Sequence, residues 1–412
     1  MSPFQPLRLP NGGEVPNRIA KAAMEENLAD ADQAPSAALL RLYQAWAEGG
    51  VGLILSGNVM IDGRAMTGPG GVVLENDRHL QRFREWARVG RSRGAQFWLQ
   101  LNHPGRQVQT NLGQGAIAPS AVPLEMGRFS KLFAVAREMT EDDIAEVVER
   151  FVRAARLAEQ AGFTGVQIHA AHGYLLSQFL SPLANKRQDR WGGSLENRAR
   201  LLLDVVRAVR AEVSPQFCVG VKINSADFQR GGFDASDARQ VIEWLNDEKV
   251  DLVELSGGSY EAPAMQGDAR DGRTLAREAY FLEFAREMRE AARMPLMVTG
   301  GIRRLPVAEQ VLESGLAMVG IGTALALEPQ LVLHWQRGSQ TQPELPPIRW
   351  RSKPLAALAY MALVKLQLKR IGARRAPNPQ ASPLRTLVME QWHTLRRARQ
   401  YRRWAARQGA SS

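Results

Sequence analysis

The chain has 412 residues, of which 45% are hydrophobic and 23% charged, a composition typical of a globular protein with a large core. Its one cysteine, Cys218, excludes disulfide frameworks, cysteine-ligated zinc and iron–sulfur clusters. The first twenty residues lack a signal-peptide pattern, and no apolar run reaches membrane-spanning length, so we expect a cytoplasmic protein.

The net charge of +11 is distributed unevenly along the chain. Residues 340–412 contain 15 Lys/Arg and 2 Asp/Glu and so carry +13, which leaves −2 on residues 1–339. We therefore divide the chain into a main domain, residues 1–340, and a basic helical extension, residues 341–412.

The main domain is predicted to be a (β/α)8 TIM barrel preceded by an N-terminal hairpin. Residues 1–16 predict the hairpin, with Asn11-Gly12-Gly13 as its turn, placed to close the barrel floor. Strands are expected at 19–22, 51–57, 97–101, 165–169, 218–223, 252–255, 296–299 and 318–321, and most of them are continuous apolar runs, typical of strands covered on both faces. Helical patterns separate them, at 36–48, 78–93, 140–161, 195–213, 236–247, 275–292 and 306–314. The main alternative, a doubly wound Rossmann sheet, needs a Gly-x-Gly-x-x-Gly turn after the first strand, which this sequence lacks.

Two connections carry local signals of their own. Thr140 and Asp143 predict a capping box at the start of the helix 140–161, which Gly162 ends. Residues 103–139 form a long connection rich in Gly, Pro and small polar residues at the catalytic end of the barrel. We interpret it as a lid or substrate-pocket excursion; a passive surface insertion is the alternative.

His169, His172 and Tyr174 come directly after the apolar run Gly165-Val-Gln-Ile168, which is expected to be a buried strand. Side chains that leave a strand end at this spacing can converge on one small polar ligand, two as hydrogen-bond donors and one as a proton source. This grouping suits an enzyme that polarises a carbonyl and then delivers a proton. The alternative is that the three side chains merely pack beneath the following loop.

The same segment resembles the Old Yellow Enzyme family of FMN-dependent ene-reductases. The resemblance rests on His169-x-x-His172-Gly-Tyr174-Leu, followed by Gln178-Phe-Leu-Ser-Pro, Asn185, Arg190-Trp-Gly-Gly-Ser and Glu196-Asn-Arg198. Further matching stretches occur in the right order, namely Asn17-Arg18-Ile19, Gln100-Leu-Asn-His103-Pro-Gly-Arg106, Gly300-Gly301-Ile302 and Gly320-Ile-Gly322. The resemblance extends over roughly residues 3–337 and points to the single-barrel type without an iron–sulfur cluster.

The resemblance implies an NADH:flavin oxidoreductase in which FMN, reduced by NADH or NADPH, passes hydride to an electron-poor alkene. It implies that His169 and His172 bind the carbonyl or nitro oxygen, that Asn27 is a further substrate contact, and that Tyr174 is the proton donor. The implied cofactor contacts are Ala22, Ala23, Met24, Glu25, Gly57, Gln100, Lys222, Gly300, Gly301, Gly322 and Thr323.

Three of these positions depart from the family pattern. Glu25 stands where a Thr or Cys usually tunes the flavin, and Lys222 and Thr323 each replace an arginine. A carboxylate at position 25 that faces the flavin should disfavour the anionic reduced form, whereas one that turns away would have no effect. Lys21, Arg303 and Arg304 are candidates to replace the missing phosphate-binding charge.

The extension predicts two helices, at 353–371 and 384–407, separated by Pro377 and Pro379. Three interpretations remain open: a hairpin packed against the barrel or a neighbouring subunit, a surface for an anionic membrane or acidic partner, and nucleic-acid contact. We expect a small electrophilic alkene as substrate, no metal and no nucleic acid, and leave homo-oligomer formation open. The functional alternatives are a flavin-dependent oxidase or demethylase on the same barrel, and a catalytically degenerate barrel that binds partners through the tail.

Overall fold

Eight parallel strands close into a barrel in the computed structural model of the chain, which describes residues 1–262 and 282–409. The strands pair in chain order, and β3 pairs with both β4 and β13, which closes the sheet. They are β3 (Ile19–Lys21), β4 (Leu53–Met60), β6 (Gln96–Asn102), β9 (Gly165–Ala170), β10 (Cys218–Asn224), β11 (Leu252–Ser256), β12 (Leu296–Thr299) and β13 (Met318–Ile321). The closed sheet confirms the predicted (β/α)8 barrel and excludes the open Rossmann sheet.

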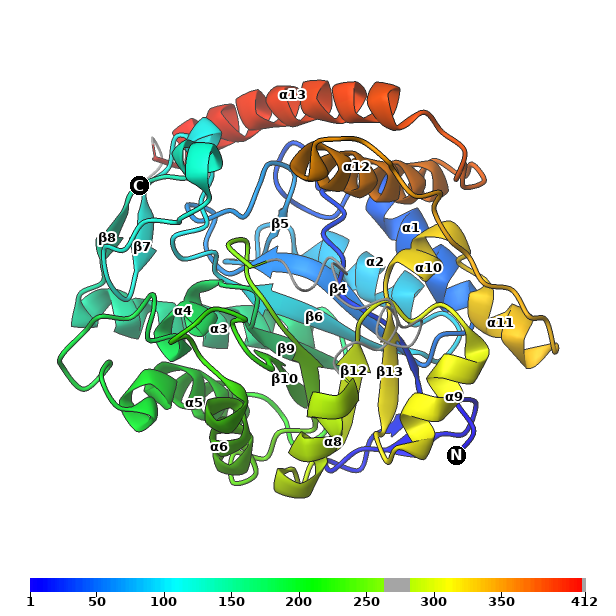
Figure 1. The fold of residues 1–412 in the computed structure, drawn as a ribbon, viewed down its shortest axis with the longest axis horizontal. Helices are drawn as coiled ribbons and strands as arrows, with labels where there is room; N and C mark the ends of the chain where they lie inside the picture. The colour runs from blue at the N-terminus through cyan, green and yellow to red at the C-terminus, as the bar shows by residue number, and fades with distance from the viewer. Residues whose placement is uncertain (263–281, 410–412) are drawn as a thin grey trace.

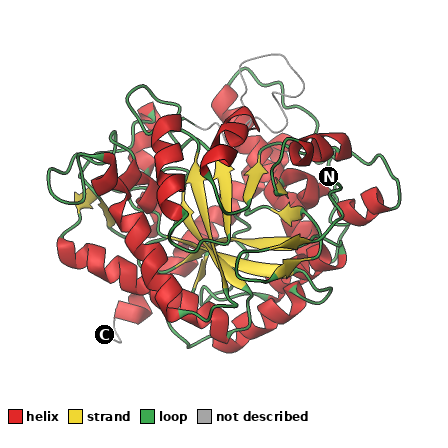
Figure 2. Ribbon diagram, turned by 90° about the horizontal axis from the view of Figure 1, so that it is seen from below, coloured by secondary structure: helices red, strands yellow, loops and turns green. Residues whose placement is uncertain are grey.

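Helices surround the strands on the outside of the barrel (Figure 2). The main ones are α1 (Ala37–Glu48), α2 (Leu80–Gly90), α3 (Glu141–Gln160), α5 (Leu195–Glu212), α6 (Ala235–Leu245), α8 (Leu282–Ala291) and α9 (Leu305–Glu313). The capping box expected for α3 is present, because the Thr140 side chain accepts from the Asp143 N–H while the Asp143 carboxylate accepts from the Thr140 N–H. The first seven residues of the helix expected at 275–292 lie outside the described residues.

The barrel floor is closed by the N-terminal hairpin, as predicted. Strands β1 (Leu7–Arg8) and β2 (Glu14–Val15) pair antiparallel, and their apolar side chains join an inner cluster with Leu53, Trp98 and Cys218. The Asn11 amide lies 3.2 Å from the Cys218 sulfur. With the floor plugged, the C-terminal ends of the strands are the end left for a functional site.

The shorter elements gave no readable pattern in the sequence. They are β5 (Val72–Val73), β7 (Ala116–Ala118), β8 (Ala136–Glu138), the 3-10 turns Thr110–Leu112 and Gly127–Leu132, and helices α4 (Leu175–Leu180), α10 (Thr323–Leu327) and α11 (Leu331–Gln336). Strands β7 and β8 pair in parallel within the excursion between β6 and α3. Elements of two to six residues are too short to show a helical or strand period.

The two helices expected for the extension are α12 (Lys353–Gly372) and α13 (Pro383–Gly409), which lie side by side at one edge of the barrel (Figure 1). α12 packs on α1 and α10. α13 buries Ala398, Tyr401 and Trp404 against Met60, the last residue of β4, and Met66 in the loop that follows. Among the described residues, no helix is long and apolar enough to cross a membrane. The division of the chain at residue 340 stays a prediction.

Candidate active site

His169, near the end of β9, lies together with His172 and Tyr174, which follow that strand, at the C-terminal end of the barrel. The ring centroids of His169 and His172 are 5.0 Å apart, and those of His169 and Tyr174 are 4.9 Å apart. His172 has a left-handed backbone (φ 60°), its N–H donates to Asn224 Oδ1 at 3.0 Å, and its carbonyl accepts from Gln107 Nε2 at 3.2 Å. These bonds hold a conformation that non-glycine residues rarely adopt, and the sharp turn sets Tyr174 beside His169.

Both imidazoles are neutral at neutral pH. Burial lowers the pKa of His169 well below its ordinary value, and the nearby His172 and Lys222 lower it further. Burial, followed by Lys222, does the same to the pKa of His172. His169 Nδ1 accepts the backbone N–H of Ala171 at 3.2 Å, so the ring proton must lie on Nε2, where it is a donor. His172 Nε2 lies 2.8 Å from the Ser256 hydroxyl.

The Tyr174 hydroxyl sits in a chain of polar side chains. It lies 3.0 Å from the Tyr260 hydroxyl and accepts from Asn58 Nδ2 at 3.4 Å, while Asn58 Oδ1 accepts from Gln100 Nε2 at 2.8 Å. Burial raises the pKa of Tyr174 well above its ordinary value, and Tyr260 and Glu25 raise it further. Tyr174 therefore keeps its proton at neutral pH.

Sequence reasoning missed Tyr260, Asn58 and Ser256. Ser256 is the last residue of β11, and Tyr260 follows four residues later in a loop. Polar residues just after a barrel strand commonly take part in the site, and this position was the one signal that could have singled them out.

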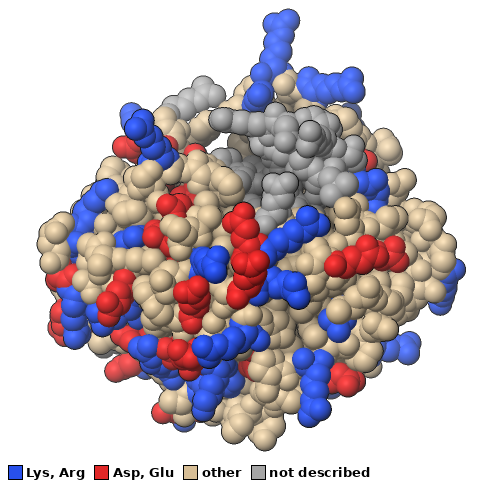
Figure 3. Space-filling view, turned by 60° about the horizontal axis from the view of Figure 1, so that its bottom comes forward, with Lys and Arg blue, Asp and Glu red and all other residues tan. Residues whose placement is uncertain are grey.

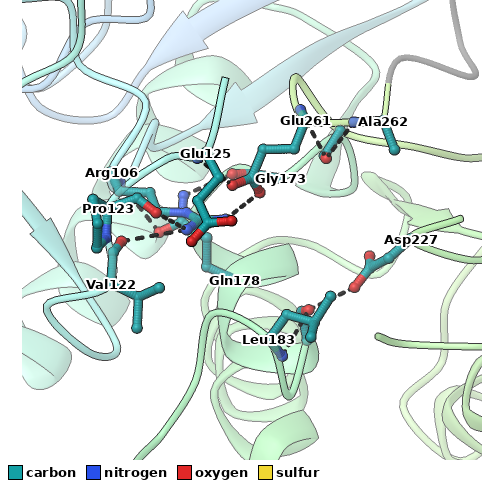
Figure 4. Close-up of polar contacts among 12 residues, drawn as sticks. Arg106, Val122, Pro123, Glu125, Gly173, Gln178, Leu183, Asp227, Glu261 and Ala262 are labelled. Carbon is teal, nitrogen blue, oxygen red and sulfur yellow. Dashed lines mark hydrogen bonds and ion pairs between the residues drawn. The ribbon is translucent and has the colours of Figure 1, made fainter. Parts of the chain in front are cut away.

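The loop that carries Tyr260 is tied to the excursion between β6 and α3 (Figure 4). Arg106 Nη2 pairs with Glu261 Oε2 at 2.6 Å, and both side chains are nearly buried. The Glu125 N–H donates to the other Glu261 oxygen at 2.7 Å, and the Phe133 ring lies 5.9 Å from the Tyr260 ring. The excursion thus forms a wall beside Tyr260, which favours a substrate-pocket role over a passive insertion.

Polar side chains from four strands fill the barrel interior beside the histidines. Glu254 pairs with Lys222 at 2.9 Å and accepts hydrogen bonds from Gln167 Nε2 and Thr299 Oγ1, each at 2.7 Å. Glu254 also escaped sequence reasoning. The buried side-chain oxygens of Gln100 and Gln167 have no partner among the described residues. A flavin ring offers N–H donors and carbonyl acceptors at its pyrimidine edge, so these amides and the Lys222 ammonium fit such a group.

Residues 22–24 border the end of the eighth barrel strand. A Cβ atom at Gly320 would lie 3.5 Å from the Ala22 side chain, and one at Gly322 would lie 3.7 Å from Met24. Ala23 packs on the inner apolar cluster. The structure therefore brings this predicted cofactor segment next to Gly322.

Glu25 turns toward the phenols. One carboxylate oxygen accepts from the Thr67 hydroxyl, and the charge is close enough to raise the pKa of both Tyr174 and Tyr260. The unusual carboxylate therefore acts electrostatically on the side of the site that holds Tyr174, the expected proton donor.

Gly57 and Asn27 shape the loop around Glu25. A Cβ atom at Gly57 would lie 2.1 Å from Glu26 Oε2, so glycine leaves room for this loop to approach the strand. Asn27 is buried with a left-handed backbone (φ 52°), and its side-chain oxygen has no partner among the described residues. No contact joins Asn27 to the histidines within the described part of the chain, so its substrate role stays a prediction.

The glycine-rich ends of β12 and β13 adjoin the C-terminal extension. The expected phosphate contacts there are Gly300, Gly301, Gly322 and Thr323. Helix α12 packs there on α10, which begins at Thr323; burial raises the pKa of Tyr360 of α12, and the neighbouring Thr323 side chain lowers it. Arg303 lies at the same end, paired with Glu344 at 3.3 Å. The extension therefore reaches the predicted cofactor end of the barrel.

Lys21 was wrong as a candidate for the phosphate charge. Side chains alternate along β3, so Lys21 points outward while Ala22 points inward. Lys21 is fully buried against α1, where its ammonium lies 3.1 Å from Glu26 Oε1 and 3.4 Å from the Tyr43 hydroxyl.

The third candidate for the phosphate charge, Arg304, lies at the N-cap of α9.

Residues 2–342 match the NADH:flavin oxidoreductase / NADH oxidase family. The chain is 37% identical over 342 residues to the NADH-dependent flavin oxidoreductase iccE of Talaromyces variabilis, covering 78% of this chain and 83% of that protein. It is 38% identical over 352 residues to the NADH-dependent flavin oxidoreductase iliE of Neonectria sp. (strain DH2), covering 79% of this chain but only 46% of that longer protein. The solved old yellow enzyme homologue of Zymomonas mobilis matches with a TM-score of 0.71 and 25% identity, covering 87% of this chain and 98% of that one.

Proposed function

Because the chain belongs to the NADH:flavin oxidoreductase or Old Yellow Enzyme family, whose members use FMN with NADH or NADPH, we propose that this oxidoreductase reduces electron-poor C=C bonds. The substrates would be α,β-unsaturated carbonyl or nitro compounds. The observation that carries this proposal is the convergence of His169, His172 and Tyr174 at the C-terminal end of the barrel.

Bound FMN would supply the hydride chemistry. Gln100, Lys222 and the segment 22–24 would hold its ring, and the phosphate would lie near Gly300, Gly301, Gly322 and Thr323. The Gln100 side-chain oxygen, which has no hydrogen-bond partner among the described residues, and the buried Lys222 ammonium support this placement.

The histidines would stabilise the charge that develops on the activating oxygen of the substrate. His169 offers its Nε2–H, fixed by the backbone bond to Nδ1. His172, now 2.8 Å from Ser256, would be the second donor. Neutral donors in a buried site stabilise an oxyanion strongly because no water competes for it.

Tyr174 would then give its proton to the carbon next to the activating group. Its raised pKa keeps the phenol protonated until a strongly basic carbanion or enolate forms. The Tyr260 hydroxyl, 3.0 Å away, is placed to share the charge left on the Tyr174 oxygen.

The test compares Tyr174→Phe with the parent in rapid mixing. NADH should reduce the flavin at the parent rate, whereas reoxidation by cyclohexenone should slow by about 10²-fold or more, as expected for the loss of a general acid. Tyr401→Phe is the matched control, because its buried hydroxyl donates to the Gly63 carbonyl of a barrel loop. An unchanged reoxidation rate in Tyr174→Phe would remove this residue from the mechanism.

Steady-state kinetics provide a second check. One pocket serving both the nicotinamide and the alkene requires ping-pong behaviour, with parallel lines in double-reciprocal plots. If amines reduced the flavin while enones failed to reoxidise it, the oxidase or demethylase alternative would replace this proposal.

A further inference from the structure

The C-terminal hairpin exposes many of the large apolar side chains of the protein. Of twelve exposed large hydrophobic residues in the described part of the chain, eight lie on α12 and α13. On α13 the exposed fractions are 62% for Leu384, 61% for Val388, 58% for Trp392 and 57% for Leu395. Scattered exposed apolar residues are normal, but a group of this kind marks an interaction surface.

These four side chains form one stripe along α13. Their spacings of four, four and three residues place them on the same side of a helix. The opposite side of α13 is already occupied, because Tyr401 and Trp404 are buried there against the barrel. The exposed stripe therefore faces away from the barrel.

The same outward side becomes basic one turn further on. Arg396, Arg399 and Arg403 are all exposed, and the Arg396 guanidinium lies 5.7 Å from the Trp392 ring. Glu390, the one acidic residue in the α13 sequence, is mostly buried in its pair with Lys369. The barrel face in Figure 3 instead mixes both signs of charge. The outward side of α13 is thus apolar in its first half and positive in its second.

From this arrangement we propose that α13 docks on an anionic lipid surface. Its apolar half enters the boundary between headgroups and acyl chains, and its arginines contact the lipid phosphates or carboxylates. A second copy fits less well, because a contact through the two apolar halves would leave the arginines of both copies with no exposed carboxylate on either α13 to pair with. α13 is the outer layer above α12 (Figure 1), so the contact requires no unfolding of the hairpin.

Vesicle co-sedimentation of the FMN-loaded full-length protein tests the proposal. We expect binding to vesicles of phosphatidylcholine mixed with phosphatidylglycerol, little binding to phosphatidylcholine alone, and release by salt. Two variants should each weaken binding by about tenfold or more while leaving NADH oxidation unchanged. They are Val388→Ser/Trp392→Ser/Leu395→Ser and Arg396→Gln/Arg399→Gln/Arg403→Gln.

The matched control is Leu132→Ser/Val135→Ser, which removes exposed apolar side chains from the barrel excursion and should bind vesicles like the parent. Failure of the parent to bind the anionic vesicles at low salt would overturn the proposal. A concentration-dependent dimer without lipid that the serine triple variant abolishes would also overturn it, in favour of a second copy. An equal loss of vesicle binding in the control would show that the α13 stripe is not the membrane-binding surface, and would also overturn the proposal.

Discussion

The hydroxyl oxygens of Tyr174 and Tyr260 lie 3.0 Å apart, so one hydrogen bond joins two phenols that come from different barrel loops. Tyr260 is itself partly buried, and its pKa is raised by desolvation and then by Glu25. A hydrogen bond from Tyr260 would stabilise the phenolate that Tyr174 becomes after it donates.

We therefore expect Tyr260→Phe to slow reoxidation of the flavin by an enone while leaving reduction by NADH unchanged. One neutral hydrogen bond is worth about 1 kcal/mol, so the slowing should be roughly fivefold, well short of the Tyr174→Phe effect. Rapid mixing of each half-reaction measures both. An equal slowing of the two half-reactions would mean that the loop merely supports the pocket.

The charge of Glu25 should contribute to the alkaline limit of proton donation. Burial is the main cause of the raised pKa of Tyr174, and Tyr260 and then Glu25 add to it, so Glu25→Gln lowers this pKa toward the ordinary value near 10. Because only the protonated phenol donates, enone reduction in the variant should fall at a lower pH than in the parent. The check is the reoxidation rate measured from about pH 7 to 10.5. Glu48→Gln, an exposed change on α1, should keep the parent profile.

The Glu254 carboxylate should partly neutralise the positive charge of Lys222 beside the cofactor. The two groups are 2.9 Å apart and almost completely buried. In Glu254→Gln the lysine charge is no longer offset, which favours an anionic reduced flavin. We expect the midpoint potential to rise by tens of millivolts, since about 30 mV corresponds to 1.4 kcal/mol for a two-electron couple.

A dye-coupled reductive titration measures this potential directly. Asp251→Asn is the matched control, because Asp251 is a buried carboxylate at the N-terminal end of the same strand, where it pairs with Arg210. A parent-like potential in Glu254→Gln would place the flavin out of reach of this pair.

Stability should fall on acidification because buried histidines resist protonation. Burial lowers the pKa of His103 from 6.5 to about 4 and depresses those of His169 and His172 as well. Below about pH 6.5 the unfolded chain takes up protons that the folded protein does not, so the stabilisation present above 6.5 is lost as the pH falls toward 4. His103 alone accounts for up to roughly 3 kcal/mol.

Urea unfolding of the parent and of His103→Gln at several pH values measures this loss. The variant should show a shallower decline, whereas His79→Gln, at the N-cap of α2, should follow the parent. Identical slopes for the parent and His103→Gln would exclude His103 as a source of the dependence.

The barrel strands were predictable because they are covered on both faces, so most of them read as largely apolar runs, as residues 318–321 do. The histidine–tyrosine cluster was predictable for a different reason: its three members lie within six residues at one strand end. Local spacing alone is enough to place them together.

The rest of the site depends on contacts between distant parts of the chain. Tyr174 meets Tyr260 across 86 residues and Asn58 across 116, and His172 meets Ser256 across 84. These residues become neighbours only when the barrel closes, and the local spacing of residues in the sequence contains no sign of such contacts. The error at Lys21 has a similar origin, because the direction of one side chain depends on where the alternation of a three-residue strand begins.

The lone thiol at the barrel floor has a practical consequence. Burial raises the pKa of Cys218 to about 12, and the N-terminal hairpin covers it. At neutral pH it is almost entirely in the unreactive thiol form. Cys218 should therefore not react with maleimide dyes. A dye attached to an introduced Val388→Cys would be the single label, and it could report the surroundings of α13 without prior removal of Cys218.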